Sequence, residues 1–454
     1  MSLTLCSIQF APRTDRVVHM STALAKALQL TSTNMLTMKM GSRTASVSLR
    51  MTKKPGKHII LPLSVKSQLM VPRSGQITVQ ASGTKEVQLG PLIGILANGT
   101  GSVTQPFGVR SSMLKSYISA GSKTSYYFAF LPSDIDWQAE TVVAYFPNGT
   151  GWIRKTVPLP DAVYNRLSNR RVDRSISMDQ LKDRFVRRGI GIFNWSFFDK
   201  SDVYKLLEED KEANKHVPES HNNPSPDRIR EMLEKHRFVY LKPTAGSLGI
   251  GIYRLTYHPK RGYFVRFRRG GKNVLFRFNN TSGLFKLLNG NGRMRNYVVQ
   301  QGIRLIEIDA CPIDFRFHLN KNGNNQWVVA GIGAKKAGKG SVTTHVKNGG
   351  QVMTPEYVLD RVFGAKAEGI LEDAKQSAIK LAESIEKHGR RNLGELGLDI
   401  GIDQNERVWM FEANSKPGRS IFKHPALKAQ GNSSLKYIAE HLAYLGKFRS
   451  RRES

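Results

Sequence analysis

The chain of 454 residues carries 69 Lys and Arg residues against 36 Asp and Glu residues, which gives a formal net charge of +33 at pH 7. The apolar fraction of 40% excludes a largely disordered chain, and the two cysteines exclude a disulfide framework or a cysteine-rich zinc site. No apolar run reaches the ~18 residues of a membrane span, and the N-terminal apolar stretch is too short for a signal peptide. We therefore expect two or three domains, synthesis in the cytosol without secretion, and anionic partners.

The first 90 residues are basic, because Asp15 and Glu86 are their only acidic residues. Stretches such as "TASVSLRMT" and "GQITVQASG" alternate in the manner of strands, and we find no internal repeat. From "LGPLIGILANG" onward, apolar strands and glycine-rich turns alternate with amphipathic segments, which predicts an α/β unit. We predict a basic β-rich module at 1–90, a small α/β domain at 91–194 and a third domain at 195–454.

The stretch "LKPTAGSLGIGIYRL" places Lys242 ahead of glycines spaced G-x-x-G-x-G. Walker and dinucleotide-binding loops both open a helix, whereas "IYRLTY" predicts a strand. Protein kinases place the lysine after the loop, not before it. Two interpretations remain open here: a phosphate-binding loop between two strands, or a plain hairpin with a surface lysine.

The stretch "GLDIGIDQNERVWMFEANSKPG" predicts a hairpin with the two-residue turn "QN". This turn would set Asp399 opposite Met410 and place Glu412 and Asn414 on the same face. Two carboxylates and an amide oxygen form a hard ligand set that suits Mg²⁺ or Mn²⁺, and the absence of His and Cys from the set argues against zinc. An ordinary exposed hairpin face is the alternative.

The order of lysine strand, glycine-rich loop, strand and carboxylate hairpin resembles the ATP-grasp superfamily, over roughly 195–446. The resemblance implies two α+β subdomains that clasp ATP and Mg²⁺. It implies an adenine-binding hinge in "YVVQQGIRLIEID", a phosphate-binding arginine in "PIDFRFHL", and a mobile loop in "GIGAKKAGKGSVTTHVKNGG" with Lys335 or Lys336. A buried strand, an exposed ion-paired arginine and a solvated basic loop are the respective alternatives. The implied residues are Lys242, Arg316 and Lys335 for catalysis; Lys242, Gly246, Ser247, Gly249, Gly251, Gln300, Gln301, Gly302, Ile303 and Glu307 for the nucleotide; and Asp399, Glu412 and Asn414 for the metal.

More narrowly, "GWIRKTVPLPDAVYNRLSNRR", "HVPES", "VVQQGI", "DFRF" and "FEANSKPGRS" resemble the YheC/YheD family of endospore coat-associated ATP-grasp proteins, from about residue 90 to the end. This resemblance implies an α/β domain ahead of the ATP-grasp fold and a spore-coat setting, without an established substrate. We therefore predict an ATP-grasp fold of two α+β subdomains, preceded by a small α/β pre-ATP-grasp domain and a basic β-rich N-terminal module.

The leading functional hypothesis is an ATP-dependent carboxylate-amine ligase that acts through an acyl phosphate. Its cofactors would be ATP and Mg²⁺ or Mn²⁺, and its basic surface suits an acidic peptide, protein or other anionic polymer, including a spore coat protein. One alternative is a nucleotide-binding structural or adaptor protein of the coat with little turnover, and another is a polyanion binder. We do not expect nucleic acid to be the main partner, because no recognition motif or aromatic stacking platform is evident. Ligase and kinase chemistry are not separated by the sequence.

Overall fold

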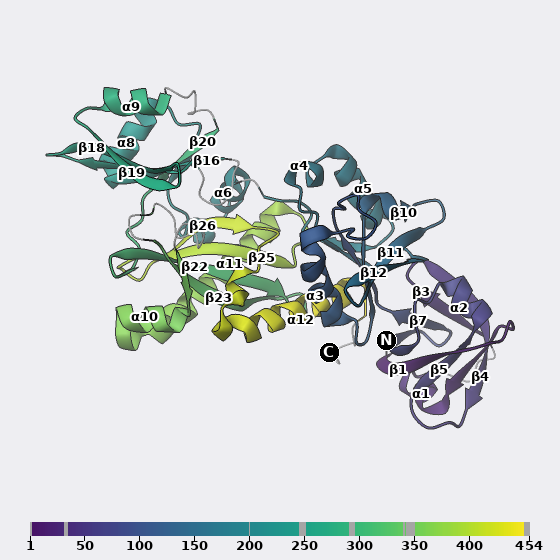
Figure 1. Cartoon of the computed structure of the whole chain (residues 1–454). Helices are drawn as coiled ribbons and strands as arrows, with labels where there is room; N and C mark the ends of the chain where they lie inside the picture. The colour runs from purple at the N-terminus through teal and green to yellow at the C-terminus, as the bar shows by residue number, and fades with distance from the viewer. Residues whose placement is uncertain are drawn as a thin grey trace.

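The computed structural model describes residues 2–30, 35–198, 200–244, 251–289, 296–338, 341 and 350–448. Figure 1 shows a barrel at one end, an α/β unit beside it, and two further sheets that lie one above the other at the opposite end. Within these ranges, no helix is both long and apolar enough to cross a membrane. The four sheets position the candidate site described below.

The N-terminal strands form a closed barrel in the order β1-β5-β2-β4-β3-β7-β6. Strands β4 and β5 and helix α2 each begin 41 residues after β1, β2 and α1, at positions 43, 58 and 63 against 2, 17 and 22. The elements are β1 Ser2–Ala11, β2 Val17–Ser21, α1 Thr22–Ala27, β3 Met35–Met40, β4 Arg43–Thr52, β5 His58–Pro62, α2 Leu63–Leu69, β6 Gly75–Ser82 and β7 Glu86–Gly90.

The barrel is therefore a structural repeat, and our finding of no internal repeat was wrong. Equivalent strands of the two halves make equivalent pairings. β1 pairs with β5 as β4 pairs with β2, in parallel, and β1 pairs with β6 as β4 pairs with β3, antiparallel. The two halves have kept burial but little identity: Val18 and Met20 are buried in one half, and Ile59 and Leu61 are buried at the matching positions of the other. Packing constrains apolar volume more than residue identity, so the repeat is hidden in the sequence.

The α/β unit contains a sheet in the order β10-β11-β9-β8-β13-β14, with β12 added beside β11. Strand β8 is the switch point, since β9 and β13 pair with it in parallel on opposite sides. In such sheets the crevice outside the carboxyl ends of these strands is the usual ligand position. The elements are β8 Leu92–Leu96, α3 Ser111–Gly121, β9 Tyr126–Phe130, β10 Ile135–Asp136, β11 Thr141–Asn148, β12 Gly151–Pro158, β13 Ala162–Asn165, α4 Arg170–Asp173, α5 Ile176–Arg187 and β14 Gly191–Phe193.

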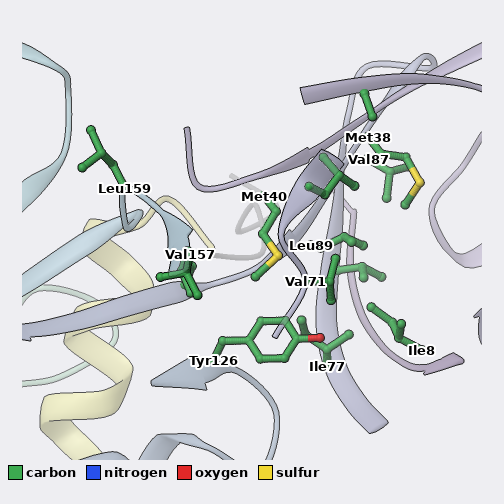
Figure 2. Close-up of a cluster of buried hydrophobic side chains, with 14 of the residues drawn as sticks. Ile8, Met38, Met40, Val71, Ile77, Val87, Leu89, Tyr126, Val157 and Leu159 are labelled. Carbon is green, nitrogen blue, oxygen red and sulfur yellow. The ribbon is translucent and has the colours of Figure 1, made fainter. Parts of the chain in front are cut away.

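The barrel and the α/β unit share one apolar cluster. Figure 2 shows Met40 of the barrel beside Val157 of β12, and Tyr126 of β9 beside Ile77 of β6. The Tyr126 hydroxyl also donates to the Arg73 carbonyl at 2.9 Å. The shared cluster shows that the barrel is packed against the α/β unit and does not hang from a linker. Apolar area buried in such a contact stabilises it by about 25 cal/mol per Å².

The β16 sheet has the order β15-β20-β16-β17-β18-β19, and helices α8 and α9 cover one of its faces. Residues from both helices, such as Leu233 and Leu284, pack on Val239, Leu255 and Val265 of the strands. The opposite face carries Lys242. The elements are β15 Ser220–Asn222, α8 Pro226–His236, β16 Phe238–Pro243, β17 Tyr253–His258, β18 Gly262–Arg269, β19 Lys272–Phe278, α9 Thr281–Asn289 and β20 Tyr297–Gln301.

The β25 sheet has the order β24-β23-β22-β25-β26, with β21 beside β22. Helix α12 packs on β22 and β23 and also on α3 and β13, and its Ile438 and Leu442 join the core of the α/β unit. This helix therefore ties the β25 sheet to the α/β unit. The elements are α6 Lys200–Glu208, α7 Lys211–Asn214, β21 Glu307–Ile308, β22 Cys311–Lys321, β23 Trp327–Lys336, β24 Gln351–Met353, α10 Pro355–Phe363, α11 Ala367–Gly389, β25 Glu395–Ile402, β26 Val408–Asn414 and α12 Lys428–Leu445.

Candidate active site

The carboxylate hairpin is formed by β25 and β26, and its loop is longer than the predicted two-residue turn. The innermost pair of the ladder is Ile402 with Val408, so residues 403–407 separate the strands. Continued without interruption, this register would set Asp399 opposite Phe411. The predicted register, with Asp399 opposite Met410, was therefore wrong.

A β-bulge changes the register between Asp399 and Ile400. Beyond it Asp399 pairs with Glu412, and Gly397 pairs with Asn414. Directly paired residues point to the same face of a sheet, and so do residues two positions apart on one strand. Asp399, Glu412 and Asn414 therefore share one face, because the one-residue bulge compensates for the odd number of residues in the loop.

Two cations hold the Asp399 carboxylate. Arg316 on β22 makes a bidentate contact, with Nε 2.8 Å from Oδ1 and Nη2 2.8 Å from Oδ2. The Lys335 ammonium on β23 lies 2.9 Å from the same Oδ1 and 2.9 Å from Asp314. Burial alone would raise the pKa of Asp399, but Arg316 and Lys335 hold it well below its ordinary value. The site thus keeps an ionised carboxylate between two cations.

The neighbouring lysines Lys335 and Lys336 point to opposite faces of β23. Lys335 reaches Asp399 and Asp314, whereas Lys336 contacts Asp309. The resemblance implied that this segment is a mobile loop, but both lysines lie at the end of strand β23. Of the implied mobile loop, 339–340 and 342–349 lie outside the described residues.

On the facing sheet, Lys242 is tied into a chain of polar contacts. Its Nζ donates to the Gln300 side-chain oxygen, and the Gln300 amide nitrogen donates to the Tyr204 hydroxyl at 2.8 Å. Tyr204 in turn donates to the carbonyl of Phe411 at 2.7 Å, and the Phe411 ring centroid lies 5.5 Å from Lys242 Nζ. Because Phe411 precedes Glu412 in β26, this chain brings Lys242 to the carboxylate hairpin.

The hinge after β20 is closely packed. The backbone N–H of Gln301 donates to the Glu219 carbonyl at 2.8 Å, and that of Gly302 donates to the Phe238 carbonyl at 3.0 Å. These two amides are engaged within the protein, as is the buried Gln300 side chain, while Ile303 is half-buried in the segment that follows. Of the two predicted glutamines, Gln300 therefore contacts Lys242 and Tyr204, and its carbonyl is already used.

The remaining predicted nucleotide residues are spread around this hinge. Glu307 is exposed at the start of β21, where it pairs with Pro312. Gly251 is the last glycine of the glycine-rich loop, and its carbonyl accepts a hydrogen bond from the Tyr297 hydroxyl at 3.1 Å. Gly246, Ser247 and Gly249 lie outside the described residues.

A buried network behind the site escaped sequence reasoning, and Glu395 is its centre. The Glu395 carboxylate contacts His318 at 2.9 Å, Arg419 at 3.2 Å and Arg166 at 3.4 Å, and it accepts a hydrogen bond from Tyr164. Burial would raise the pKa of Glu395, but His318 and the two arginines lower it to about 2. Tyr164 and Arg166 come from the α/β unit, so this network fixes that unit to β22 and β25.

The sequence pattern also predicts that Asp314 shares a strand face with Arg316, and the structure confirms this face, but the pattern gave Asp314 no role. Alternation along "PIDFRFHL" was the available signal, but it does not reveal the partner strand that brings Lys335 within reach. Among the residues that the structure describes, no group of three or more His, Cys, Asp or Glu could hold a metal. The predicted set of two carboxylates and one amide is nevertheless compatible with a hard cation. The Asp399 carboxylate has roughly four lone-pair sites, and its hydrogen bonds from Arg316 and Lys335 use three of them, so one remains for a metal.

An α/β unit followed by two facing sheets, with a lysine on one and a carboxylate hairpin on the other, defines the ATP-grasp class. The profile of the YheC/D-like ATP-grasp family matches residues 189–445. The chain is 37% identical over 365 residues to the endospore coat-associated protein YheD of Bacillus subtilis (strain 168). The aligned region covers 79% of this chain and 80% of the relative. For YheC of the same strain, identity is 23% over 308 residues, with 64% and 81% covered. The chain therefore belongs to the YheC/D-like ATP-grasp family.

Two solved structures match much of the chain at low identity. The ATP-grasp ligase PsnB complexed with a minimal precursor, Mg and ADP gives a TM-score of 0.45 at 13% identity, with 78% of this chain and 98% of that chain covered. D-alanyl-alanine synthetase A from Vibrio cholerae gives a TM-score of 0.45 at 10% identity, with 79% and 98% covered. The predicted fold class and family are confirmed by the profile match and the identity to YheD.

Proposed function

We propose that the protein is an ATP-dependent carboxylate-amine ligase that uses Mg²⁺ or, in its place, Mn²⁺. The observation that carries this proposal is the contact of Arg316 and Lys335 with Asp399, on the face that also bears Glu412 and Asn414. Such a cluster combines fixed cations for a phosphate with oxygen ligands for a metal. Lys242 lies across from it on the β16 sheet.

In the proposed reaction, a carboxylate oxygen of the substrate attacks the γ-phosphorus of ATP, and the bond to the β–γ bridging oxygen breaks to release ADP. The amine nitrogen then attacks the acyl phosphate carbon, loses a proton, and displaces inorganic phosphate to leave an amide. When bound, the metal would offset charge on the transferred phosphoryl group. Lys242, Arg316 and Lys335 would orient the phosphates, and Glu412 and Asn414 would hold the metal with Asp399. No side-chain nucleophile is needed.

The hinge supplies the proposed nucleotide-base site. Ile303 and Glu307 would contact the adenine edge and the ribose hydroxyls, while Gln301 and Gly302 shape the hinge through contacts with Glu219 and Phe238. Gln300 would act indirectly, by holding Lys242. Gly246, Ser247, Gly249 and Gly251 are the proposed phosphate-loop residues.

We further propose that the carboxylate belongs to an acidic peptide or protein. The formal charge of +33 favours an anionic substrate, and relatives described as endospore coat-associated favour a coat protein and location at the spore coat. A division of the chain at residues 90 and 194 into a module, a pre-ATP-grasp domain and the ATP-grasp domain is part of this proposal.

Hydroxylamine trapping tests the chemistry directly. Incubation of the full chain with Mg-ATP, a glutamate-rich peptide and hydroxylamine should yield ADP and a peptide hydroxamate, detected by mass spectrometry, because hydroxylamine intercepts an acyl phosphate. A stable added phosphoryl group would identify a kinase instead. Absence of both ADP and hydroxamate over a panel of acidic peptides would contradict the ligase proposal.

Lys335 and Lys336 provide a matched pair for the same assay. Lys335→Ala should lower kcat by about a hundredfold or more, because it removes a cation from the reacting phosphate. Lys336→Ala removes the same charge from the opposite strand face and should stay within about twofold of the wild type, because its ion-pair partner Asp309 is exposed and such a pair contributes little. Equal losses in both variants would show that only general charge matters.

A further inference from the structure

The β16 sheet and its helices form an unusually basic part of the molecule. The segment 235–306 contains 15 Lys and Arg residues and no Asp or Glu. The nucleotide needs only a few of these cations. Six of them lie on strands β17, β18 and β19: Arg254, Arg266, Arg268, Arg269, Lys272 and Arg277. Strands β18 and β19 lie at the end of the molecule away from the barrel (Figure 1).

Strand β19 is the outer edge of this sheet, and within the described residues no strand pairs with its far side. Natural edges are commonly protected by short length, proline, a bulge or charges. β19 has seven residues without proline, and its ladder with β18 runs without a shift. Its centre is Leu275, 55% exposed, followed by Phe276, 39% exposed. Its two charged residues, Lys272 and Arg277, flank this stretch, so the edge is open and is apolar only at its centre.

The two faces of the sheet beside this edge carry different kinds of side chain. Leu275 pairs with Arg266, which pairs with Arg254 on β17, so these three residues share the face opposite the helices. Arg268 is exposed on the same face, two positions beyond Arg266. Phe276 pairs with Val265 and lies on the helix-covered face. On one face, a strand added to β19 would lie beside Leu275 and Arg277, with Arg266 and Arg268 one strand further in. On the other face it would lie beside the apolar side chains Val274, Phe276 and Phe278.

We propose that β19 binds an extended acidic peptide as an added strand, with acidic side chains toward Arg266 and Arg268 and alternate apolar side chains toward Phe276. Backbone pairing at an open edge supplies affinity, and the alternation of side chains supplies specificity. A peptide fits better than nucleic acid, because the edge offers backbone donors and acceptors, and the Phe276 ring is stacked on Phe267, with ring centroids 5.9 Å apart. The inference deepens the proposed function and rests on it only in taking this peptide as the ligase substrate.

The probe is a short fluorescent peptide that alternates glutamate and valine, titrated into the full chain without nucleotide at fixed moderate salt. Two N-methylated versions carry methyl groups on opposite alternating sets of backbone nitrogens. One set points toward β19 and the other points away from it, so only one version should lose affinity, by about tenfold or more. Amides of β19 should also gain protection from hydrogen exchange.

Charge is tested with the double variant Arg266→Ser/Arg268→Ser, which should bind the unmethylated peptide about tenfold more weakly. Lys53→Ser/Lys54→Ser removes the same charge from an exposed loop of the barrel and should leave affinity within about twofold. Thermal unfolding and Mg-ATP titration of each variant confirm that the fold is intact.

Equal binding of all three peptides, or equal effects of both charge variants, would overturn strand addition in favour of general polyanion binding. Tighter binding of a single-stranded oligonucleotide that displaces the peptide would assign the face to nucleic acid. Mg-ATP binding is measured separately, so failure of the peptide site and failure of the proposed ligase function are distinguishable.

Discussion

The buried carboxylate of Asp161 makes the stability of the fold depend on pH. Its oxygens accept hydrogen bonds from the backbone N–H of Leu92 at 2.7 Å and from the Gln88 side chain at 2.8 Å. Burial raises the pKa of Asp161 from 3.8 to about 7, against the lowering effect of these hydrogen bonds. The folded chain therefore binds this proton more tightly than the unfolded chain does.

Because the folded-state pKa is the higher one, the stability that Asp161 contributes is present below about pH 4 and is lost as pH rises to about 7. The free energy of unfolding should fall by at most about 1.4 kcal/mol per pH unit across this window. In Asp161→Asn this part of the slope should disappear, as measured by urea unfolding at several pH values. Asp373→Asn, at an exposed position of α11, should keep the wild-type slope, and an unchanged slope in Asp161→Asn would contradict the assignment.

Residues in sequence motifs were easier to find than residues in spatial networks. Lys242, Asp399 and Glu412 could be singled out because the spacing of each segment is informative on its own. Glu395 could not, since Arg166 approaches it from the end of β13, which is distant in sequence. The contact of Asp314 with Lys335 could not be inferred either, because it depends on the register between β22 and β23. The partners of a buried charge depend on strand order, which local patterns do not encode.

At the scale of elements, Gly302 sets how closely the hinge approaches β16. A Cβ atom there would lie 2.1 Å from the Phe238 ring and 2.6 Å from the Phe238 carbonyl oxygen. Gly302→Ala should therefore displace the end of β20, lower the stability by about 1–3 kcal/mol and weaken Mg-ATP binding. Calorimetric titration and thermal unfolding measure both effects.

Gly369→Ala is the control for this substitution, because an added Cβ at this position of helix α11 has open space around it. It should leave Mg-ATP affinity unchanged and raise stability by about 0.5–1 kcal/mol, since alanine favours the helix. Indistinguishable Mg-ATP affinities in the two variants would show that the hinge position does not matter for the nucleotide.

The carboxylate hairpin marks the limit of sequence reasoning at this scale. Alternation predicted both strands, because side chains on a strand point to opposite faces. The loop length and the compensating bulge between Asp399 and Ile400 were not predicted. Both depend on the local backbone conformation, which is set by packing of β25 between β22 and β26 and not by composition.

At the scale of the molecule, basic composition and alternation indicated a β-rich N-terminal module, but not its closure or its repeat. Closure depends on parallel pairing between strands separated by more than 40 residues, such as Ser7 with His58. Likewise, α12 lies at the end of the chain yet packs on the α/β unit through Ile438 and Leu442. Such long-range contacts leave only a general apolar pattern in each segment.

The central claim is that the two facing sheets bind Mg-ATP, and titration calorimetry at fixed moderate salt tests it most directly. The wild type should bind Mg-ATP, and Glu412→Gln should lose the metal-dependent part of this affinity, since it keeps the side-chain shape and removes one ligand charge. Glu406→Gln, an exposed position in the hairpin loop, should behave as the wild type. A folded wild type that fails to bind Mg-ATP, or equal metal dependence in wild type and Glu412→Gln, would contradict the account.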